Sequence, residues 1–403
     1  MRYVQVDTQS DPESVTHPTT QKQKDLSAML YSELLQMGLK DVSTNEYGYV
    51  YATLPASSSK GNIPAICFCA HVDTAPDCSG TAVQPILHKN YSGEDIVLPH
   101  DTTQVLSIKQ SPYLKNHIGS DIITASGLTL LGADDKAGVA IIMQAMQTLM
   151  DHPEILHGDI KIVFTPDEEV GKGTAKIDME KLGARYGYTL DGGELGSLED
   201  ETFSADAATI TIHGVIAHPG YAKNKLVNAM KIAGKILAAL PTTEWSPETT
   251  EGKQGFVHPV SLNGIAEKTT IGFIVRDFKT DALPAHHGRL KQLAEEIVQQ
   301  YPGASMEYHA QEQYRNMKDV LQEHPQVVAY AAEAIKRAGL TVKTESIRGG
   351  TDGSRLSYMG MPCPNLFTGM QNIHSKLEWV GVKDMMKAVE TVVHLAAVWE
   401  EKS

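Results

Sequence analysis

Three carboxylates stand side by side in the stretch "FTPDEEVGKG", at Asp167, Glu168 and Glu169. They come directly after the run "KIVFTP", where a buried β-strand is expected to end. Adjacent acids repel one another, and in such a place the repulsion needs an offsetting interaction. Either a cation held by the acids or a proton shared among them would supply it.

Polar side chains follow other apolar runs in the same way. They are His71 and Asp73 after "CFCA", Asp134 and Asp135 after "LLGA", Asp191 after "GYTL", and His374 after "PNLFTGMQNI". Two imidazoles and several carboxylates suit zinc, cobalt or manganese, and two metals that share a bridging carboxylate fit the number of segments better than one tetrahedral site. Asp73, close to His71 in sequence, could accept the second ring N–H of a metal-bound histidine. Each acid alone is more often a helix cap or a solvated loop residue, so only their joint placement carries weight.

The elements that must position these residues alternate along the chain. Short β-rich runs lie at 63–70, 159–165 and 185–190, with a helical pattern at 137–150. This alternation is typical of an α/β fold with a mostly parallel sheet. Because the carboxyl ends of parallel strands lie along one edge, where such folds place their ligands, the polar residues can meet at one place.

From about residue 206 the pattern changes. Strands are predicted at 207–214, 258–263, 268–277 and 305–311, and helices at 227–240 and 283–300. The order β-α-β-β-α-β is that of the ferredoxin-like split unit. We therefore predict an α/β catalytic domain formed by residues 1–205 and 317–403, with an α+β unit, residues 206–316, inserted into it.

Composition narrows the class of protein. A chain of 403 residues exceeds what one hydrophobic core usually supports. The formal charge of -14 argues against nucleic acid or an anionic membrane as a partner. No apolar run approaches the roughly 20 residues that cross a bilayer, and no apolar stretch follows Arg2, so we expect a cytoplasmic protein. The four cysteines lack CxxC spacing and are expected to be reduced thiols.

Seven motifs together resemble the co-catalytic zinc aminopeptidases of the M20 family, and specifically its tripeptide-cleaving branch. They are "HVDTAPDCSG", "LLGADDKAG", "FTPDEEVGKG", "YTLDGG", "HPGYAK", "IRGGTDG" and "CPNLFTG". The resemblance runs from near Tyr3 to the carboxyl terminus. It implies two Zn²⁺ per subunit, for which Co²⁺ or Mn²⁺ can substitute, and small peptide substrates. It also implies that the inserted unit serves as a lid, and it is compatible with a homodimer.

The resemblance also implies roles for individual residues near the metals. Asp134 would bridge the two ions, with His71 and Asp191 completing the ligands of one and Glu169 and His374 those of the other. Glu168 would be the general base and Asp73 the acid that orients His71. A cis peptide bond between Asp134 and Asp135 is implied as well. Asp167 receives no role, and we interpret it as a solvated loop residue.

Four further residues are substrate-binding or transition-state candidates. His218, in "AHPG", resembles the family histidine that stabilises the oxyanion; without the resemblance it would be a surface histidine. Arg276 and Arg348 could grip a substrate carboxylate, with Asn228 assisting, and a structural ion pair is the alternative for each arginine.

The resulting hypothesis is an aminopeptidase that releases the first residue of tripeptides with metal-activated water. One alternative is another M20-type amidohydrolase, a dipeptidase or an acylamino-acid deacylase. Another is a catalytically silent protein that binds metal or peptide. The presence of Glu168 argues against a silent binder, because such a protein has no need of a base beside its ligands.

Overall fold

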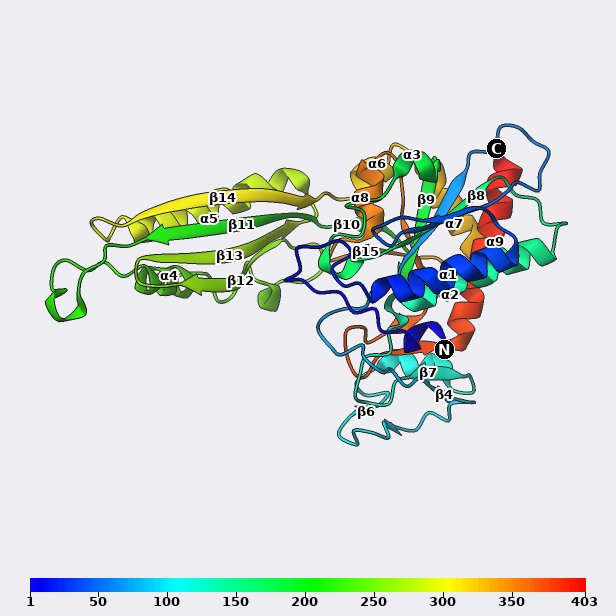
Figure 1. Ribbon diagram of the computed structural model, residues 1–403, viewed down its shortest axis with the longest axis horizontal. Coiled ribbons are helices and arrows are strands. Elements are labelled where there is room, and N and C mark those ends of the chain that lie inside the picture. Colours follow the sequence, from blue (N-terminus) through cyan, green and yellow to red (C-terminus); the bar gives the residue numbers. More distant parts are fainter. The chain divides into compact units, whose positions relative to one another are not determined.

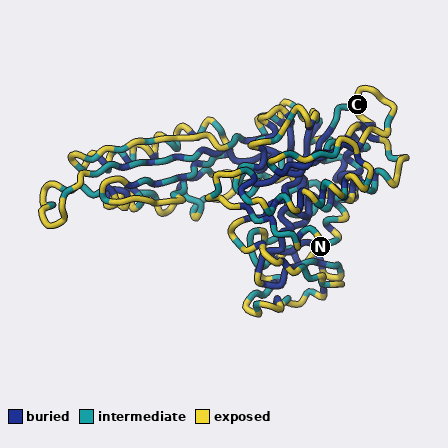
Figure 2. Tube along the Cα trace, viewed as in Figure 1, coloured by how far each residue is buried: buried dark blue, intermediate teal, exposed yellow.

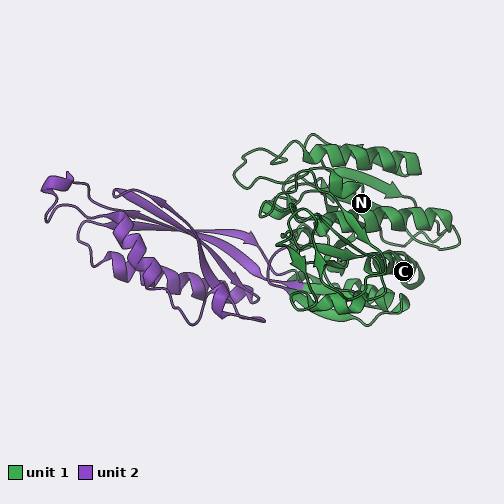
Figure 3. Ribbon diagram, turned by 90° about the horizontal axis from the view of Figure 1, so that it is seen from below, with its two compact units in different colours: residues 1–200, 317–346, 351–403 green, residues 201–316, 347–350 purple.

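The computed structural model describes residues 1–403 and divides into two units (Figure 3). Unit 1 contains Met1–Asp200, Met317–Ser346 and Thr351–Ser403, and unit 2 contains Glu201–Asn316 and Ile347–Gly350. Unit 2 begins before the boundary predicted at 206, because its first strand already pairs at Ser204 with Asp277. The segment 347–350 joins unit 2, where the Phe203 N–H donates to the Ile347 carbonyl over 3.2 Å.

Unit 1 is a helix-covered sheet with smaller sheets beside it (Figure 1). Its helices are α1 (Gln23–Met37), α2 (Ala133–Asp151), α3 (Met179–Leu182), α6 (Lys318–Leu321), α7 (Pro325–Arg337), α8 (Asp352–Tyr358) and α9 (Val382–Lys402), with the 3-10 turns η1 (Tyr3–Gln5), η2 (Pro112–His117) and η3 (Glu168–Val170). The main sheet has the order β1 (Lys40–Thr44), β2 (Val50–Leu54), β8 (Ile160–Thr165), β3 (Ile66–His71), β9 (Tyr186–Gly192), β16 (Asn365–Phe367), β10 (Ser197–Thr202), β15 (Lys343–Ile347). A second sheet contains β17 (Met370–Gln371), β18 (Trp379–Gly381), β7 (Ile122–Thr124) and β4 (Ile86–His88), and β5 (Ile96–Val97) pairs with β6 (Val105–Leu106).

The centre of the main sheet is parallel and buried on both faces. Strands β8, β3, β9 and β16 run parallel, and β1, β2 and β10 flank them in antiparallel pairs. Cys67 and Cys69 of β3 pack on one face, against side chains of α3 and α8. Phe68, which points the other way, lies 6.0 Å from the Tyr188 ring, and the Tyr188 hydroxyl accepts from Trp399 of α9. The buried runs of Figure 2 follow these strands. The predicted α/β fold is therefore confirmed.

Helix α2 is held close to the carboxyl end of β9. A Cβ atom at Gly138 would lie 1.9 Å from the carbonyl oxygen of Leu190, so only glycine allows this approach. The second and third residues of the helix, Asp134 and Asp135, have non-helical backbone angles, and the peptide bond between them is cis. The close approach at Gly138 places the Asp134 end of α2 beside Asp191.

Unit 2 is an antiparallel sheet with both helices packed on one face. It contains β11 (Ser204–His213), α4 (Ala229–Ala238), β12 (Phe256–Gly264), β13 (Lys268–Asp277), α5 (Leu283–Val298) and β14 (Ser305–Tyr314), with the 3-10 turns η4 (Pro219–Tyr221), η5 (Pro247–Thr249) and η6 (Thr280–Ala282). The strand order is β12-β13-β11-β14. Alternate residues such as Ile210, Ile212 and Phe273 pack against Ile232 and Leu290 of the helices. The predicted β-α-β-β-α-β order is confirmed.

Two expectations from composition can be compared with the structure. All four cysteines are free, as predicted, and Cys67, Cys69 and Cys363 are buried. Burial raises the pKa of each of these three thiols. Among the helices, none combines the length and the hydropathy needed to cross a bilayer.

Candidate metal centre

The carboxyl ends of the parallel strands converge on one cluster of side chains. His71 is the last residue of β3, Asp191 lies near the end of β9, and Glu168 and Glu169 form η3 directly after β8. Asp134 opens α2, and His374 lies in the turn between β17 and β18. The structure thus brings together all five predicted metal ligands and the predicted base from five separate segments.

Asp134 lies between the two histidines. Its Oδ1 atom is 3.0 Å from Nε2 of His71, and its Oδ2 atom is 3.2 Å from Nε2 of His374. Each carboxylate oxygen therefore faces a different imidazole. A carboxylate in this position can give one oxygen to each of two metal ions.

Each histidine has a second carboxylate beside the same nitrogen. Nε2 of His374 lies 3.0 Å from Oε2 of Glu169, and Nε2 of His71 lies 3.7 Å from Oδ1 of Asp191. The cluster therefore has two halves that share Asp134. One half contains His71 and Asp191, and the other contains His374 and Glu169.

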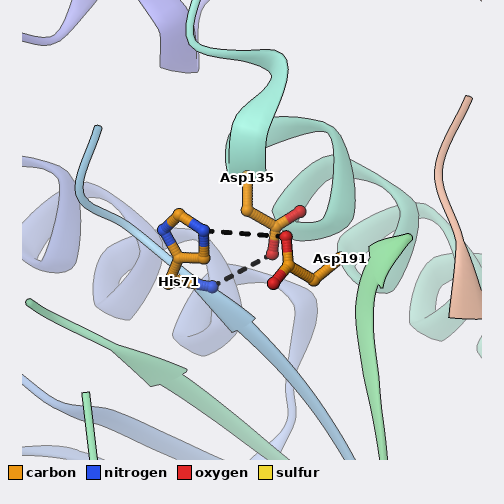
Figure 4. A group of neighbouring side chains, drawn as sticks. All are labelled: His71, Asp135 and Asp191. Atoms are coloured by element: carbon orange, nitrogen blue, oxygen red, sulfur yellow. Dashed lines mark hydrogen bonds and ion pairs between the residues drawn. The ribbon is translucent and has the colours of Figure 1, made fainter. Parts of the chain in front are cut away.

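Asp135 also lies near His71 and Asp191, but its oxygens accept from backbone N–H groups (Figure 4). Oδ2 accepts from the backbone N–H of His71 over 3.1 Å, and Oδ1 accepts from that of Gly138 over 3.1 Å. Its side chain is fully buried. Asp135 therefore fixes the end of β3 to the start of α2, a role that the sequence analysis missed, and Asp134 is the better candidate for a ligand.

The electrostatics of the cluster favour a bound cation. Burial, together with the Asp134 carboxylate, raises the pKa of Glu169 to about 8, and burial raises that of Asp191 to about 6. Hydrogen bonds to Asp134 and Glu169 raise the pKa of His374 to about 11. Burial alone would lower the pKa of His71, but the carboxylates of Asp134, Asp191 and Asp73 raise it well above its usual value. Protons in such a cluster are the ones that a metal ion displaces on binding.

The donor set fits divalent metal ions of the zinc type. Two imidazole nitrogens and three carboxylates are the ligand types that zinc, cobalt and manganese accept. Oε1 of Glu169 is buried and has no hydrogen-bond partner in the protein. An orphaned, buried carboxylate oxygen is uncommon, and a bound cation would satisfy it. His71, Asp134 and Glu169 also place ligand atoms within 4.8 Å of one another.

The loop after β3 supplies a carboxylate to the second nitrogen of each histidine. Oδ1 of Asp73 lies 3.3 Å from Nδ1 of His71, and Oδ2 of Asp77 lies 3.4 Å from Nδ1 of His374. A carboxylate in this place fixes the tautomer and the orientation of a ligating imidazole. Asp73 also accepts from the backbone N–H groups of Glu168 and Glu169, over 3.0 and 3.2 Å. Asp73 lies where a carboxylate can orient His71, and its orienting role stays a prediction. Asp77 was not anticipated, because it lies about 300 residues from His374 in the sequence.

Glu168 stands beside the ligands without belonging to either half of the cluster. Burial and the neighbouring carboxylates Asp191, Asp352 and Glu169 raise its pKa well above the usual range, although His71 opposes this. A carboxyl group whose pKa has been raised is suited to accept and return a proton near neutral pH.

Glu378 anchors the loop that carries Asp134. Its buried carboxylate accepts from the backbone N–H groups of Leu131 and Gly132, both over 2.7 Å, and from that of Asp134 over 3.0 Å. Sequence reasoning missed this residue, because nothing in the order of residues links position 378 to position 134.

The Glu378→Gln variant is expected to lower the free energy of unfolding by about 1–3 kcal/mol. The glutamine side chain has an NH₂ group in place of one carboxylate oxygen, so at least one of the backbone N–H groups loses its acceptor. Urea denaturation followed by circular dichroism measures the change. An unchanged midpoint and slope would show that these three hydrogen bonds contribute no net stability.

The interpretation of Asp167 as a solvated loop residue is wrong. Its side chain is fully buried and accepts from the backbone N–H of Thr19 over 2.8 Å, from the Thr19 hydroxyl, and from Nε2 of Gln23 over 2.7 Å. The prediction failed because the partners lie almost 150 residues away in sequence. Local polarity cannot reveal such a partner.

The remaining candidates belong to unit 2, where their immediate surroundings differ. Nδ1 of the exposed His218 accepts from the Gly220 N–H over 3.2 Å, so the neutral ring carries its proton on Nε2. Arg348 is occupied, since it donates to the carbonyls of Gly252 and Gln254 and to the hydroxyl of Thr250 over 2.5, 3.3 and 3.1 Å.

Arg276 and Asn228 complete the predicted set. Arg276 donates from Nη1 to the Arg348 carbonyl over 3.2 Å, and its Nε atom is buried without a partner. Arg276 therefore uses fewer of its N–H groups within the protein than Arg348 does. Asn228 caps α4, because its Oδ1 accepts from the N–H groups of Met230 and Lys231.

The chain belongs to peptidase family M20/M25/M40, whose family model matches residues 131–398. It is 47% identical over 402 residues to Peptidase T of Geobacillus thermodenitrificans, and the alignment covers 100% of this chain and 97% of that protein. Peptidase T of Listeria monocytogenes is 46% identical over 401 residues, with the same coverage. The family resemblance read from the motifs is confirmed.

Solved structures share the fold. The aminopeptidase PepT from Bacillus cereus superposes with a TM-score of 0.75 at 24% sequence identity and covers 99% of this chain and 96% of its own. A tripeptidase from Staphylococcus aureus gives a TM-score of 0.75 at 22% identity and covers 100% of this chain and 96% of its own. The fold extends to a Bacillus subtilis protein described as a dinuclear metal-binding peptidase from the M20 family, with a TM-score of 0.66 at 16% identity.

Proposed function

We propose that this protein is a dizinc aminopeptidase that removes the first residue of tripeptides. The observation that carries the proposal is the position of Asp134, with one oxygen toward His71 and the other toward His374. The carboxyl group of Glu168 lies close enough to His71 and Glu169 for their charges to act on it. The two relatives described above are both named Peptidase T, and their name supports the same class of activity.

The proposed ligands are His71, Asp134 and Asp191 for one ion, and Asp134, Glu169 and His374 for the other. Two bound ions would make a water molecule more acidic and polarise the peptide carbonyl. Glu168 would accept the proton of the attacking water and deliver it to the departing amine. Asp73 would hold His71 in one orientation and, through the N–H groups of Glu168 and Glu169, keep the base and a ligand in place.

Substrate choice tests the proposal directly. Purified protein loaded with zinc should cleave a free tripeptide faster than it cleaves the matching dipeptide or an N-acetylated peptide. A chelator should stop the cleavage. Faster cleavage of the dipeptide or of the N-acetylated peptide would instead identify another M20-type amidohydrolase. No cleavage of any of them by metal-loaded protein would identify a silent binder.

We include a lid role for unit 2 in the proposal. His218 and Arg276 belong to unit 2, whereas Glu168 and the metal ligands belong to unit 1. If these residues act on one substrate, the catalytic cycle must bring residues of both units to the same peptide. Closure of this kind excludes water and completes a catalytic site.

Arg276 is the proposed clamp for the substrate carboxylate. The Arg276→Ala variant should raise KM for free-acid tripeptides about 10- to 100-fold, because a charge-assisted hydrogen bond is lost. Carboxyl-amidated tripeptides have no carboxylate to grip, so their KM should change little. Paired kinetics on the two substrates measure the difference. An equal effect on both would reject the clamp and make Arg348 the better candidate.

His218 is the proposed donor to the oxyanion, because its Nε2 carries the proton. The His218→Ala variant should lower kcat about 100-fold with little change in KM, since the negative charge that it contacts develops only in the transition state. Steady-state kinetics on one tripeptide measure both constants. A rise in KM at unchanged kcat would assign His218 to substrate binding instead.

A cytoplasmic location and a homodimer remain predictions of this proposal. The four free thiols fit a reducing compartment, where cysteines are kept reduced. Cell fractionation tests the location, and sedimentation velocity tests the oligomeric state.

A further inference from the structure

The segment of residues 8–23, here called the strap, contacts two loops of the candidate metal centre. One loop follows β3 and carries Asp73 and Asp77. The other follows β8 and carries Glu168 and Glu169. The strap contains none of the proposed ligands, and the reaction outlined above makes no use of it.

The first part of the strap is fixed to the loop after β3. Gln9 forms an isolated bridge with Thr74, and its Nε2 donates to the carbonyls of Ala75 and Cys78 over 3.0 and 2.8 Å. The Ser10 N–H donates to the Thr74 carbonyl over 3.1 Å. These contacts lie within the loop that supplies a carboxylate to each histidine.

The second part of the strap surrounds Asp167, the residue directly before Glu168. Thr19 donates to its carboxylate through both the N–H and the hydroxyl, and Nδ1 of His17 lies 3.1 Å from Oδ2. Gln23 contacts it twice, because Nε2 donates to Oδ1 over 2.7 Å and Oε1 accepts from the Asp167 N–H over 3.0 Å. Asp167 has a φ angle of 61°, so the turn into Glu168 depends on a left-handed residue that these contacts hold.

The two parts of the strap are joined to each other. The Thr20 hydroxyl donates to the Gln9 carbonyl over 2.7 Å, and the Asp11 N–H donates to the Thr19 hydroxyl over 3.1 Å. Lys172, just beyond η3, adds a further contact by donating to the Ser14 carbonyl over 2.9 Å. The loops after β3 and β8 are therefore connected through a third segment as well as through Asp73.

We propose that the strap positions the metal-site loops and that Asp167 is the residue through which it sets the placement of Glu168 and Glu169. Asp167 is a positioning residue, because its carboxylate contacts Thr19, Gln23 and His17 of the strap. A fully buried carboxylate with this many donors allows few orientations of the backbone that follows it. Loosening it would move a base and a ligand together.

The Asp167→Asn variant is the first test. Its kinetic measurement rests on the proposed function, whereas its zinc measurement does not. The variant should lower kcat for a tripeptide about 10- to 100-fold, with a smaller effect on KM. In a chelator titration, one of the two zinc ions should be bound less tightly than in the wild type. The chelator titration measures zinc retention and can be carried out even if the wild type cleaves no tripeptide. Wild-type protein without tripeptidase activity would reject the proposed function, whereas wild-type kcat and zinc retention in Asp167→Asn would overturn the strap inference.

Exchanging the carboxylate of residue 167 with the amide of residue 23 distinguishes a positioning role of Asp167 from a general loss of stability. In the double variant Asp167→Asn, Gln23→Glu, the new amide at position 167 can donate to the new carboxylate at position 23, which still accepts the N–H of residue 167. The double variant should recover kcat and zinc retention to within about fivefold of the wild type, because the contact is remade with the groups reversed. A folded double variant no better than Asp167→Asn would overturn the inference.

Matched controls complete the design. Asp384 is also a buried carboxylate of unit 1, and it accepts from the Tyr113 hydroxyl over 3.0 Å and lies 3.1 Å from His117. Asp384→Asn should lower the melting temperature without selective loss of one zinc ion, and an equal selective loss would overturn the inference. If Asp167→Asn does not fold, Thr19→Val removes a single donor, and its failure to lower kcat or zinc retention would likewise overturn it.

Discussion

The Glu168→Gln variant is expected to keep its fold and both proposed metal ions while kcat falls about 100- to 10,000-fold, because only the proposed proton carrier is lost. The amide has nearly the shape of the carboxyl group, and Glu168 belongs to neither half of the ligand cluster. KM should change little, since substrate binding does not require the proton transfer. Steady-state kinetics on a free tripeptide, with metal content measured on the same sample, give the result.

The metal analysis decides how a loss of activity is interpreted. A variant that has lost a metal ion says nothing about the base, so the comparison is valid only at equal metal content. Near-normal turnover by fully loaded Glu168→Gln would remove this residue from the mechanism.

The Asp134→Ala variant is expected to lose both metal ions, whereas His374→Ala should weaken the binding of chiefly one ion. If roughly 10 kcal/mol of binding free energy is shared by three or four ligands, losing one costs about 3 kcal/mol, or about a hundredfold in affinity. Asp134 contributes to both halves, so its loss lowers two affinities at once. A chelator titration followed by metal analysis resolves the two ions.

Asp135→Asn is the matched control for Asp134. The neighbouring carboxylate contacts backbone N–H groups rather than the second histidine, so this variant should be less stable but should retain both ions. Loss of both ions from Asp135→Asn, with retention by Asp134→Ala, would transfer the bridging role to Asp135. Equal retention of two ions by Asp134→Ala and His374→Ala would reject a bridge at Asp134.

The parts of the fold that could be predicted are those whose signal is local. Apolar runs and turn residues predicted the parallel strands, and β13 was predicted with its observed bounds, Lys268–Asp277. The region from Ile86 to Thr124, with four very short strands, was not predicted. Strands of two or three residues have too few side chains to show a period, and their pairing is decided by contacts distant in sequence.

The same division applies to the candidate site. His71, Asp134, Glu169 and Asp191 follow strand ends or open a helix, so the rule for parallel sheets placed them together. Residues that act by holding others were missed or misread. Asp167 was read as solvated although Thr19 and Gln23 surround it, and Glu378 was missed although it accepts three N–H groups near Asp134. Their roles depend on partners that only the folded chain brings near.

The order of the proposed ligands along the chain has a consequence for biosynthesis. His71, Asp134, Glu169 and Asp191 all precede unit 2, and His374 follows it. During synthesis the ribosome therefore makes four ligands, then the whole of unit 2, and only afterwards the fifth. Domains tend to fold as units while the chain emerges, so unit 2 can fold before residue 374 exists. A nascent chain would hold an incomplete set of the proposed ligands throughout that interval, and the proposed second ion would be acquired only after translation has passed position 374.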